Sequence, residues 1–456
     1  MLWDVIVIGA GMSGLAAGLR LALAGKKVLV LEQHNAIGGL NGFYMKNGIK
    51  YDVGLHALTN FVLPHCKGHP LIKLCRQLRI PYEALQLKQQ KSSRIQFPEI
   101  SLTFTNHFEY LCEEIAKHFS HEKDNFLKLD AHIMQLSDTA LNGPSFISAR
   151  QQLKYFIQDS FLQEMLLLPL FYYGSAHVND LDWRQFAILY KAIYREGFAR
   201  PLGGVRQILR LLRERFREWG GVLRVKSEVT SLVCKNRHVE SVVLKSGEVL
   251  QAKQILSSVG LRETQALCGH PTFNTPSVLT FIETISTLDA SPKTLNCKDT
   301  ITFYSKKPFV NYAPAKNLVD INSGVICIPE NYEAHELPER TTLRTTHLAN
   351  YAQWASLSSE AYAESKKFWL ENSRQCAYHI LGCKSANVIA EDMFTPLTIL
   401  KYTKHFQGAI YGAPEKIRNG NLGYENLFLC GTDQGFLGIV GALLSGISMA
   451  NYHCLK

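Results

Sequence analysis

The stretch VIVIGAGMSGLAAG, Val5 to Gly18, constrains the fold more than any other part of the chain. It begins in DVIVIG, whose short β-branched and apolar run is typical of a buried parallel strand. Gly9, Gly11 and Gly14 follow in the spacing G-x-G-x-x-G, and a helical pattern then runs to Gly25. KKVLVLEQ has the pattern of a second strand. We therefore predict a strand, a glycine turn, a helix and a second strand in direct succession.

This succession predicts a Rossmann-like α/β unit that binds a dinucleotide at the start of the helix. The first glycine makes the tight turn, the second lets the backbone approach a diphosphate, and the third lets helix and strand pack closely. Glu32, at the end of the second strand, is placed to accept hydrogen bonds from a ribose, and it would repel a 2′-phosphate, which argues against NADP. The loop alone leaves NAD and FAD open. The candidate binding residues are Gly9, Ala10, Gly11, Met12, Ser13, Gly14, Glu32 and Gln33.

A second glycine motif follows the second strand, in HNAIGGLNGFYMKNGIKYDVGLHAL. The doublet Gly38-Gly39, continued by Leu40 and Asn41, has no general purpose in NAD dehydrogenases. FAD is longer and would pass this segment, so the doublet favours FAD. The segment from Gly38 to Gly54 is also compatible with a glycine-rich β-hairpin that contacts no ligand.

A third motif lies near the other end, in NLFLCGTDQGFLGIVGALLSG. It reads as a strand that closes on Gly431 and Asp433, followed by a glycine-started helix. We expect Asp433 to bond the ribityl hydroxyls or to lie near the diphosphate. The amides around Gly438, Ile439 and Val440 would face the flavin N1–C2=O edge, where a helix N-terminus favours negative charge. Together the three motifs predict FAD.

The region from Arg200 to Gly260 fits between the two halves of such a cofactor domain. It begins with a helix that has one apolar face, and several alternating strands follow the doublet Gly220-Gly221. Val229 is expected on the strand that passes the adenine.

On these motifs the chain resembles the carotenoid desaturase and isomerase group of FAD flavoproteins, which includes phytoene desaturases and retinol saturases. The resemblance implies a glutathione-reductase-like FAD-binding domain of the amine-oxidase and phytoene-desaturase branch, joined to a discontinuous α+β substrate domain. There are two departures: Leu40 and Asn41 stand where many relatives carry arginine, and GTDQGFLG replaces the GxxTHPG ending of phytoene desaturases. The second departure weakens phytoene itself as the substrate.

The resemblance divides the chain into a cofactor domain at 1–99, 196–275 and 395–456, and a substrate domain at 100–195 and 276–394. Within the substrate domain, the leucine-rich and aromatic run Leu166 to Tyr173 has three interpretations. It could line an apolar tunnel, rest in lipid, or be an ordinary core helix.

The implied activity is hydride exchange between flavin N5 and a long apolar substrate, isoprenoid, carotenoid-like or another lipid, with desaturation, saturation or isomerisation of C=C bonds as the outcome. Such a site needs few charged groups, and no Ser-His-Asp or metal cluster is evident. The candidate catalytic residues are His56, Tyr172 and Tyr173. Two alternatives stay open: an FAD-dependent amine oxidase, and a non-enzymatic prenyl-binding escort protein that shares the fold.

Composition limits the compartment in which the protein is expected and the partners that it is expected to bind. The chain has 46% hydrophobic and 19% charged residues, and its net charge of +10 comes from scattered basic residues, without a nucleic-acid-binding signature. The 11 cysteines form no C-x-x-C pair, which suits reduced thiols in the cytoplasm. We see no signal peptide and no apolar run of roughly 18 residues, as a membrane span would need. Any membrane contact is therefore expected to be peripheral, with an apolar small molecule or lipid as the partner.

Overall fold

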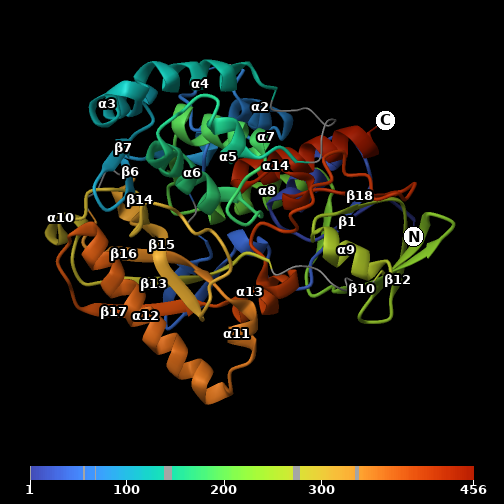
Figure 1. Ribbon diagram of the computed structural model, residues 1–456. Coiled ribbons are helices and arrows are strands. Elements are labelled where there is room, and N and C mark those ends of the chain that lie inside the picture. Colours follow the sequence, from blue (N-terminus) through green and yellow to red (C-terminus); the bar gives the residue numbers. More distant parts are fainter. Residues whose placement is uncertain are drawn as a thin grey trace.

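Two seven-stranded sheets form the frame of the computed structural model, which describes residues 2–54, 57–66, 68–137, 146–270, 278–333 and 338–455 (Figure 1). The first sheet contains β1 (Leu2–Ile8), β2 (Val28–Leu31), β9 (Val222–Arg224), β10 (Val229–Lys235), β11 (His238–Leu244), β12 (Val249–Ser257) and β18 (Leu427–Leu429). Its parallel part has the order β9–β2–β1–β12–β18. With β1 in the middle, this order confirms the predicted Rossmann-like unit.

Helices from three distant parts of the chain cover one face of this sheet: α1 (Met12–Ala22), α8 (Arg206–Glu218) and α14 (Gly438–Met449). The apolar face predicted after Arg200 is buried here, through Ile208, Leu209, Leu212 and Phe216 of α8. Side chains of the hairpin β10–β11, which extends the sheet beyond β12, join the core on the opposite face. Both chain ends therefore lie in the same half of the molecule, at the right of Figure 1.

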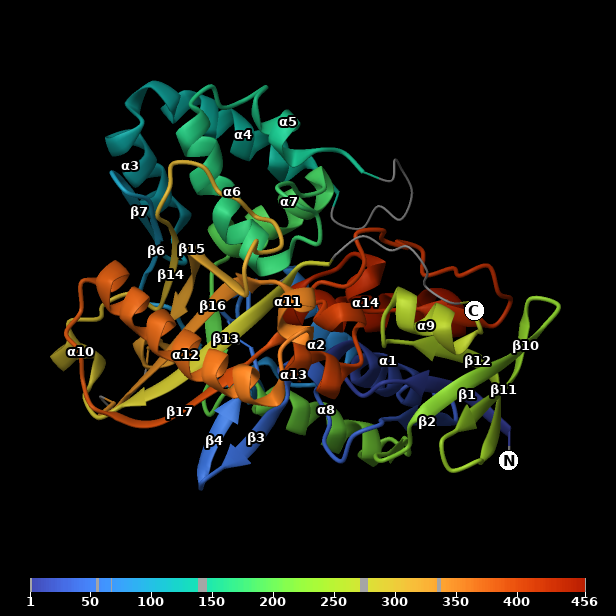
Figure 2. The same cartoon turned by 60° about the horizontal axis from the view of Figure 1, so that its bottom comes forward.

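The second sheet has the order β17–β13–β16–β15–β14–β6–β7. Its strands are β6 (Ser93–Gln96), β7 (Ser101–Phe104), β13 (Thr280–Leu288), β14 (Ile301–Ser305), β15 (Val319–Cys327), β16 (Thr341–Ala349) and β17 (Val388–Phe394). The long helix α12 (Ser359–Leu381) runs across its outer face (Figure 2). β6 lies before residue 99, inside the expected cofactor domain, yet it pairs with β14 of the second sheet.

The inner face of the second sheet packs against a helical layer and forms the largest hydrophobic core with it. The main helices of this layer are α3 (Phe108–His118), α4 (Lys123–Gln135), α6 (Ser160–Gly174) and α7 (Trp183–Tyr190). Leu166 to Tyr172 on α6 are buried inside the protein, so the interpretation that this run rests in lipid is wrong, because protein side chains surround it. Among the described residues, no helix is both long and apolar enough to cross a bilayer.

The remaining elements are short. The helices are α2 (Pro70–Gln77), α5 (Ala149–Leu153), α9 (Leu261–Leu267), α10 (Pro292–Leu295), α11 (Tyr351–Ala355) and α13 (Pro396–Thr403). The strand pairs are β3 (Phe43–Lys46) with β4 (Ile49–Asp52), and β5 (Leu87–Gln89) with β8 (Ala199–Pro201). Short helical turns include η1 (Gly39–Asn41), η6 (Phe406–Gly408) and η7 (Thr432–Gln434).

Candidate FAD site

The glycine turn after β1 has one crowded side and one open side. A Cβ built on Gly14 would lie 2.0 Å from the Gly9 carbonyl oxygen, so only glycine lets α1 pack this closely on the end of β1. A Cβ built on Gly11 would meet nothing within 4 Å. No side chain caps the start of α1, and its first turn holds no acidic residue. The amides of Met12 and Ser13 at this helix start therefore suit an anion held next to Gly11.

Glu32 follows β2 and is buried. Its Oε2 accepts a hydrogen bond from the Ala10 amide at 2.9 Å, and its Oε1 accepts one from the His34 amide at 3.0 Å. The carboxylate thus ties the end of β2 to the glycine turn. Gln33, next to it, is half-buried. Contact of Glu32 and Gln33 with a ribose stays a prediction.

The second glycine motif lies directly beside the first. The Gly38 amide donates a hydrogen bond to the Ala10 carbonyl at 2.9 Å, and Gly38 and Gly11 form an isolated parallel bridge. A Cβ built on Gly39 would lie 4.0 Å from the Cα of Gly11. Leu40 and Asn41 complete the turn η1. The hairpin β3–β4 comes after the doublet, so the segment contains both a hairpin and a close approach to the glycine turn.

The third motif meets the same helix from the C-terminal side. A Cβ built on Gly431 would lie 3.0 Å from Ser13 Oγ, and one built on Gly446 of α14 would lie 2.1 Å from the Ser13 carbonyl oxygen. The start of α14 has no side-chain cap, and Ile439 and Val440 are buried in its first turn. All three motifs therefore converge on the first turn of α1.

Asp433, in the third motif, is buried against two other segments of the chain. Its Oδ2 accepts a hydrogen bond from the Leu261 amide at 2.7 Å, and its Oδ1 accepts one from the Ala413 amide at 2.8 Å. The Lys416 ammonium donates to the same Oδ1 at 3.2 Å and to the Tyr411 carbonyl at 2.7 Å. Asp433 thus joins three segments, and a hydrogen bond to a ribityl hydroxyl stays a prediction.

The predicted catalytic tyrosines point to different places. The Tyr173 ring lies against Gly438 at the start of α14, where a Cβ would come 2.6 Å from its Cε1, and its hydroxyl donates to the Ala57 carbonyl at 3.0 Å. Burial raises the pKa of Tyr173 to about 12. Tyr172 faces the second sheet instead, with its hydroxyl 2.9 Å from Ser323 Oγ. His56 lies outside the described residues.

Val229 is the first residue of β10, where it pairs with Leu244 and packs beside the core on the far face of the first sheet. Its expected place near the adenine stays a prediction.

Sequence reasoning missed the segment between α13 and β18. The Tyr411 hydroxyl donates to the Tyr172 carbonyl, and its ring meets Phe281 edge-on at 5.9 Å between centroids. Lys416 from the same segment pairs with Asp433. The segment has no helical or strand periodicity, so only the adjacent Tyr411-Gly412 and Pro414 marked it as an ordered turn.

A buried ion-pair cluster at Asp52 joins the two halves of the molecule. Its carboxylate accepts hydrogen bonds from Arg200 at 2.8 Å and from Arg206 at 2.7 Å. Its carbonyl accepts a third, at 2.8 Å, from Arg344 on β16 of the second sheet.

Arg344 is 2% exposed and also binds Glu283 of β13, with Nε 2.9 Å from Oε1. The other oxygen of Glu283 accepts the Gly54 amide at 3.2 Å. The second sheet therefore holds both ends of the DVG sequence, Asp52 to Gly54, which begins at the last residue of β4.

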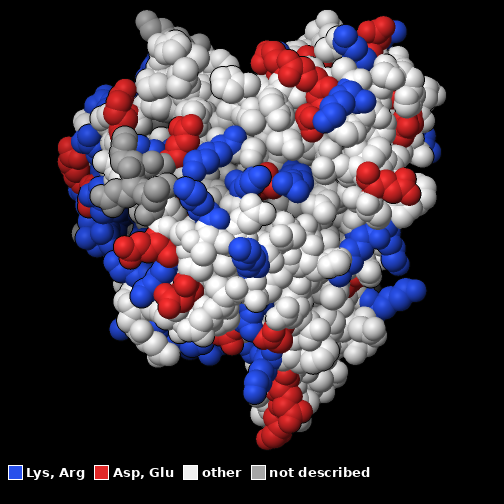
Figure 3. Space-filling view, turned by 90° about the vertical axis from the view of Figure 1, so that its left-hand side faces the viewer, with Lys and Arg blue, Asp and Glu red and all other residues white. Residues whose placement is uncertain are grey.

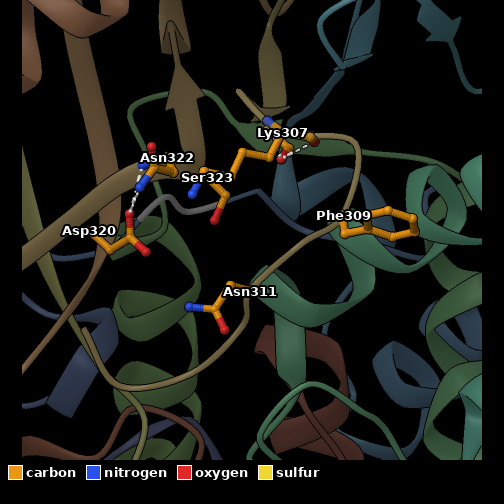
Figure 4. A pocket seen from close by; sticks show the side chains of 7 residues that line it. Lys307, Phe309, Asn311, Asp320, Asn322 and Ser323 are labelled. Carbon is orange, nitrogen blue, oxygen red and sulfur yellow. Dashed lines mark hydrogen bonds between the residues drawn. The ribbon is translucent and has the colours of Figure 1, made fainter. Parts of the chain in front are cut away.

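A separate small recess lies in the second sheet, between the end of β14 and the first half of β15 (Figure 4). It is lined by Ser305, Lys307, Phe309, Asn311, Asp320, Asn322 and Ser323, and its volume is about 40 Å³. That is room for water, not for a long substrate.

Comparison with known proteins identifies the family to which this chain belongs. A family model described as flavin-containing amine oxidoreductase matches residues 12–452, nearly the whole chain. The chain belongs to this family. Its cofactor is FAD, and the protein is an FAD-dependent oxidoreductase. The open space at Gly11 and the uncapped starts of α1 and α14 fit the diphosphate and flavin of such a cofactor.

Similar curated proteins act in carotenoid and retinoid chemistry, by their names. Prolycopene isomerase of Daucus carota is 25% identical over 56% of this chain and 46% of its own length. 4,4'-Diapophytoene desaturase of Methylomonas sp is 23% identical over 80% of this chain and 71% of its own. Human all-trans-retinol 13,14-reductase is 57% identical, but over only 53 residues, 12% of this chain and 9% of its own. The chain spans about half the length of the plant isomerases that it matches.

Solved structures share the fold of this flavoprotein. An oxidoreductase from Methanosarcina mazei superposes with a TM-score of 0.67 at 16% identity, over 98% of this chain and 99% of its own. Putrescine oxidase superposes with a TM-score of 0.62 at 16% identity, over 100% of both chains. Rab GDI of Plasmodium falciparum superposes with a TM-score of 0.53 at 11% identity, over 99% of this chain and 97% of its own. At these identities the likeness concerns the fold alone.

Proposed function

We propose that this flavoprotein acts on a long apolar substrate, isoprenoid, carotenoid-like or another lipid, and desaturates, saturates or isomerises its C=C bonds. The observation that carries the proposal is an aromatic wall built around the C-terminal end of α6, which Tyr173 joins to the start of α14. Tyr172 stacks on Phe281 at 5.6 Å between ring centroids, Tyr312 meets Tyr172 edge-on at 5.4 Å, and Tyr173 lies on Gly438. Such a wall can pack against a hydrocarbon, and aromatic faces also accept ammonium ions. The names of the similar proteins, prolycopene isomerase and diapophytoene desaturase, favour the hydrocarbon.

When bound, FAD supplies the redox chemistry, exchange of a hydride between flavin N5 and a substrate carbon. The chain's own residues would position the substrate, exclude water and hold protons. Burial raises the pKa of Tyr173 to about 12, so the hydroxyl keeps its proton at neutral pH and would not act as a base. That proton is donated to the Ala57 carbonyl, which fixes the ring against the start of α14. Tyr172 and Tyr411 are held to each other by a hydrogen bond and would fix the aromatic wall.

The test is lipid extraction from cells that carry the protein, followed by mass spectrometry. We expect an isoprenoid or lipid whose mass differs by two hydrogens, or a change of double-bond geometry at constant mass. Cells with the Gly11→Ala variant, which should fold but hold FAD poorly, are the matched control. If purified protein instead releases hydrogen peroxide with primary amines and leaves lipids unchanged, the amine oxidase alternative is correct. If it binds lipid without any change of FAD colour or lipid mass, the escort alternative is correct.

We also propose peripheral contact with an anionic membrane, because a long hydrocarbon resides there. The hairpin β3–β4 stands out from the body of the molecule (Figure 2) and exposes Phe43 and Met45 next to Lys50. On the face shown in Figure 3 charges of both signs are scattered, so contact would rely on such local features. The protein should sediment with phosphatidylglycerol vesicles at low salt. Protein that stays in the supernatant would refute membrane contact.

A further inference from the structure

Arg262, in the first turn of α9, is a buried guanidinium without a matching carboxylate in the described part of the chain. The residue is 6% exposed, and its Nη1 is buried with no hydrogen-bond partner. Its guanidinium lies 5.0 Å from the centre of the Phe406 ring. A ring face offsets only part of the cost of burying a charge.

Other described arginines with an unpartnered buried nitrogen differ from Arg262 in one respect. Arg94 pairs with Asp299, Arg200 with Asp52, and Arg418 with Asp182. Each of those cations therefore has its counter-charge inside the protein.

The carboxylates close to Arg262 are already matched by other cations. Asp433 pairs with Lys416, and Glu263 lies 3.6 Å from the ring of His405. Burial opposes the charge on His405, but the hydrogen bond to Glu263 prevails and raises the pKa of His405. Burial lowers the pKa of Lys416, and repulsion from Arg262 contributes to this. Asp433 and Glu263 therefore each have a partner other than Arg262.

Arg262 lies among the segments that surround the predicted cofactor site. The amide before it, that of Leu261, binds Asp433 of the third motif. Ser258, a few residues earlier, donates to the Gly9 carbonyl at 3.2 Å in the glycine turn. Phe406 belongs to the segment that starts at Tyr402, whose carbonyl is bonded by the ring of His34, two residues after Glu32. This segment therefore extends from the Glu32 end of the site to Arg262.

The three glycine motifs provide amides but no cation. Residues 9–14, 38–41 and 431–440 contain neither lysine nor arginine, and the third range contains Asp433. A dinucleotide diphosphate carries two negative charges, which amides and helix starts neutralise only in part.

We infer that Arg262 is a binding residue for the diphosphate of the cofactor and supplies the positive charge that the glycine motifs lack. The inference rests on FAD as the cofactor. An arginine suits this task because its planar fork can hold two phosphate oxygens at once.

The test uses the full chain, stripped of flavin, and calorimetric titration with FAD, ADP and adenosine. We expect Arg262→Met to lower the affinity for FAD and for ADP at least tenfold and to leave the affinity for adenosine unchanged, because only FAD and ADP carry a diphosphate. The affinity of Arg262→Lys for FAD and ADP should lie between those of Arg262→Met and the unchanged chain. Arg79→Met is the matched control: Arg79 also stacks on an aromatic ring, Trp219 at 4.7 Å, but it is exposed and should leave FAD affinity unchanged.

Stability of the flavin-free chain separates binding from a structural role. Removal of an unmatched buried charge should leave the melting temperature of Arg262→Met equal or higher, whereas loss of a purely structural stack on Phe406 should lower it. Equal ADP affinity in Arg262→Met and the unchanged chain, or equal losses for ADP and adenosine, would overturn the inference. If the unchanged chain binds neither FAD nor ADP, the cofactor assignment falls as well.

Discussion

Arg344 offers the sharpest test of how the two halves of the molecule are joined. Arg344→Met removes the hydrogen bonds to Glu283 and the one to the Asp52 carbonyl, and it leaves Glu283 as a poorly compensated charge. Breaking a buried pair by removing one partner costs about 3–5 kcal/mol. We therefore expect the free energy of unfolding to fall by about 4 kcal/mol.

Glu283→Gln should cost less, about 2 kcal/mol, because an amide oxygen can still accept from Arg344. The double variant should be more stable than the sum of the single losses predicts, by about 2 kcal/mol, because the pair acts as one unit. Arg340→Met is the control. Arg340 lies just before β16, in an exposed pair 3.9 Å from Asp289, and such a pair contributes about 0.5 kcal/mol or less.

The assay is urea unfolding of the FAD-loaded protein, followed by circular dichroism and by flavin fluorescence. Coincident transitions would justify a single free energy for each variant. A loss below about 1 kcal/mol for Arg344→Met, or strict additivity in the double variant, would refute the view that these contacts form one coupled junction.

Three further changes test other parts of the structure. Burial lowers the pKa of His347 to about 4, so this ring stays neutral in the folded protein, while in the unfolded chain it takes up a proton below about pH 6.5. The free energy of unfolding should therefore fall by about 3 kcal/mol between pH 7 and pH 4. His347→Gln should flatten this pH dependence, which urea unfolding at the two pH values would measure. Gly14→Ala should cost about 3 kcal/mol because its methyl group meets the Gly9 carbonyl, whereas Gly11→Ala should change the unfolding free energy by less than about 0.5 kcal/mol yet weaken FAD in a fluorescence titration. Tyr173→Phe should lose about 1 kcal/mol in thermal unfolding, for the hydrogen bond to the Ala57 carbonyl, and keep its FAD spectrum; a bleached spectrum would mean that the hydroxyl, and not the ring, supports the flavin site.

Local signals account for what the sequence predicted well. The glycine spacing and the apolar runs located β1, α1 and β2, and α1 ends at Ala22, close to the expected Gly25. A glycine required by close packing, such as Gly14, leaves a mark that a single sequence can show. The convergence of three distant motifs on α1 was predictable because each has its own fixed spacing.

Contacts between distant segments were beyond this reasoning. β6 looks like part of the first domain, but its partner β14 comes about two hundred residues later, and pairing between distant strands has no local signature. Arg262 lies in a helix start like many exposed arginines, and only its burial next to Phe406, from a distant segment, sets it apart. The sequence placed Asp433 in the third motif, but it gave no sign that the amides of Leu261 and Ala413 and the Lys416 ammonium bind its carboxylate.

The close approach of α14 to α1 has a consequence for biosynthesis. Ribosomes release the glycine turn long before α14, but residues of α14, among them Gly446, help to bury the helix that follows this turn. Until α14 appears, α1 must expose part of its apolar surface, a period in which newly made chains aggregate or recruit chaperones. Expression at a lower temperature, or with extra chaperone, should therefore raise the soluble yield of this protein.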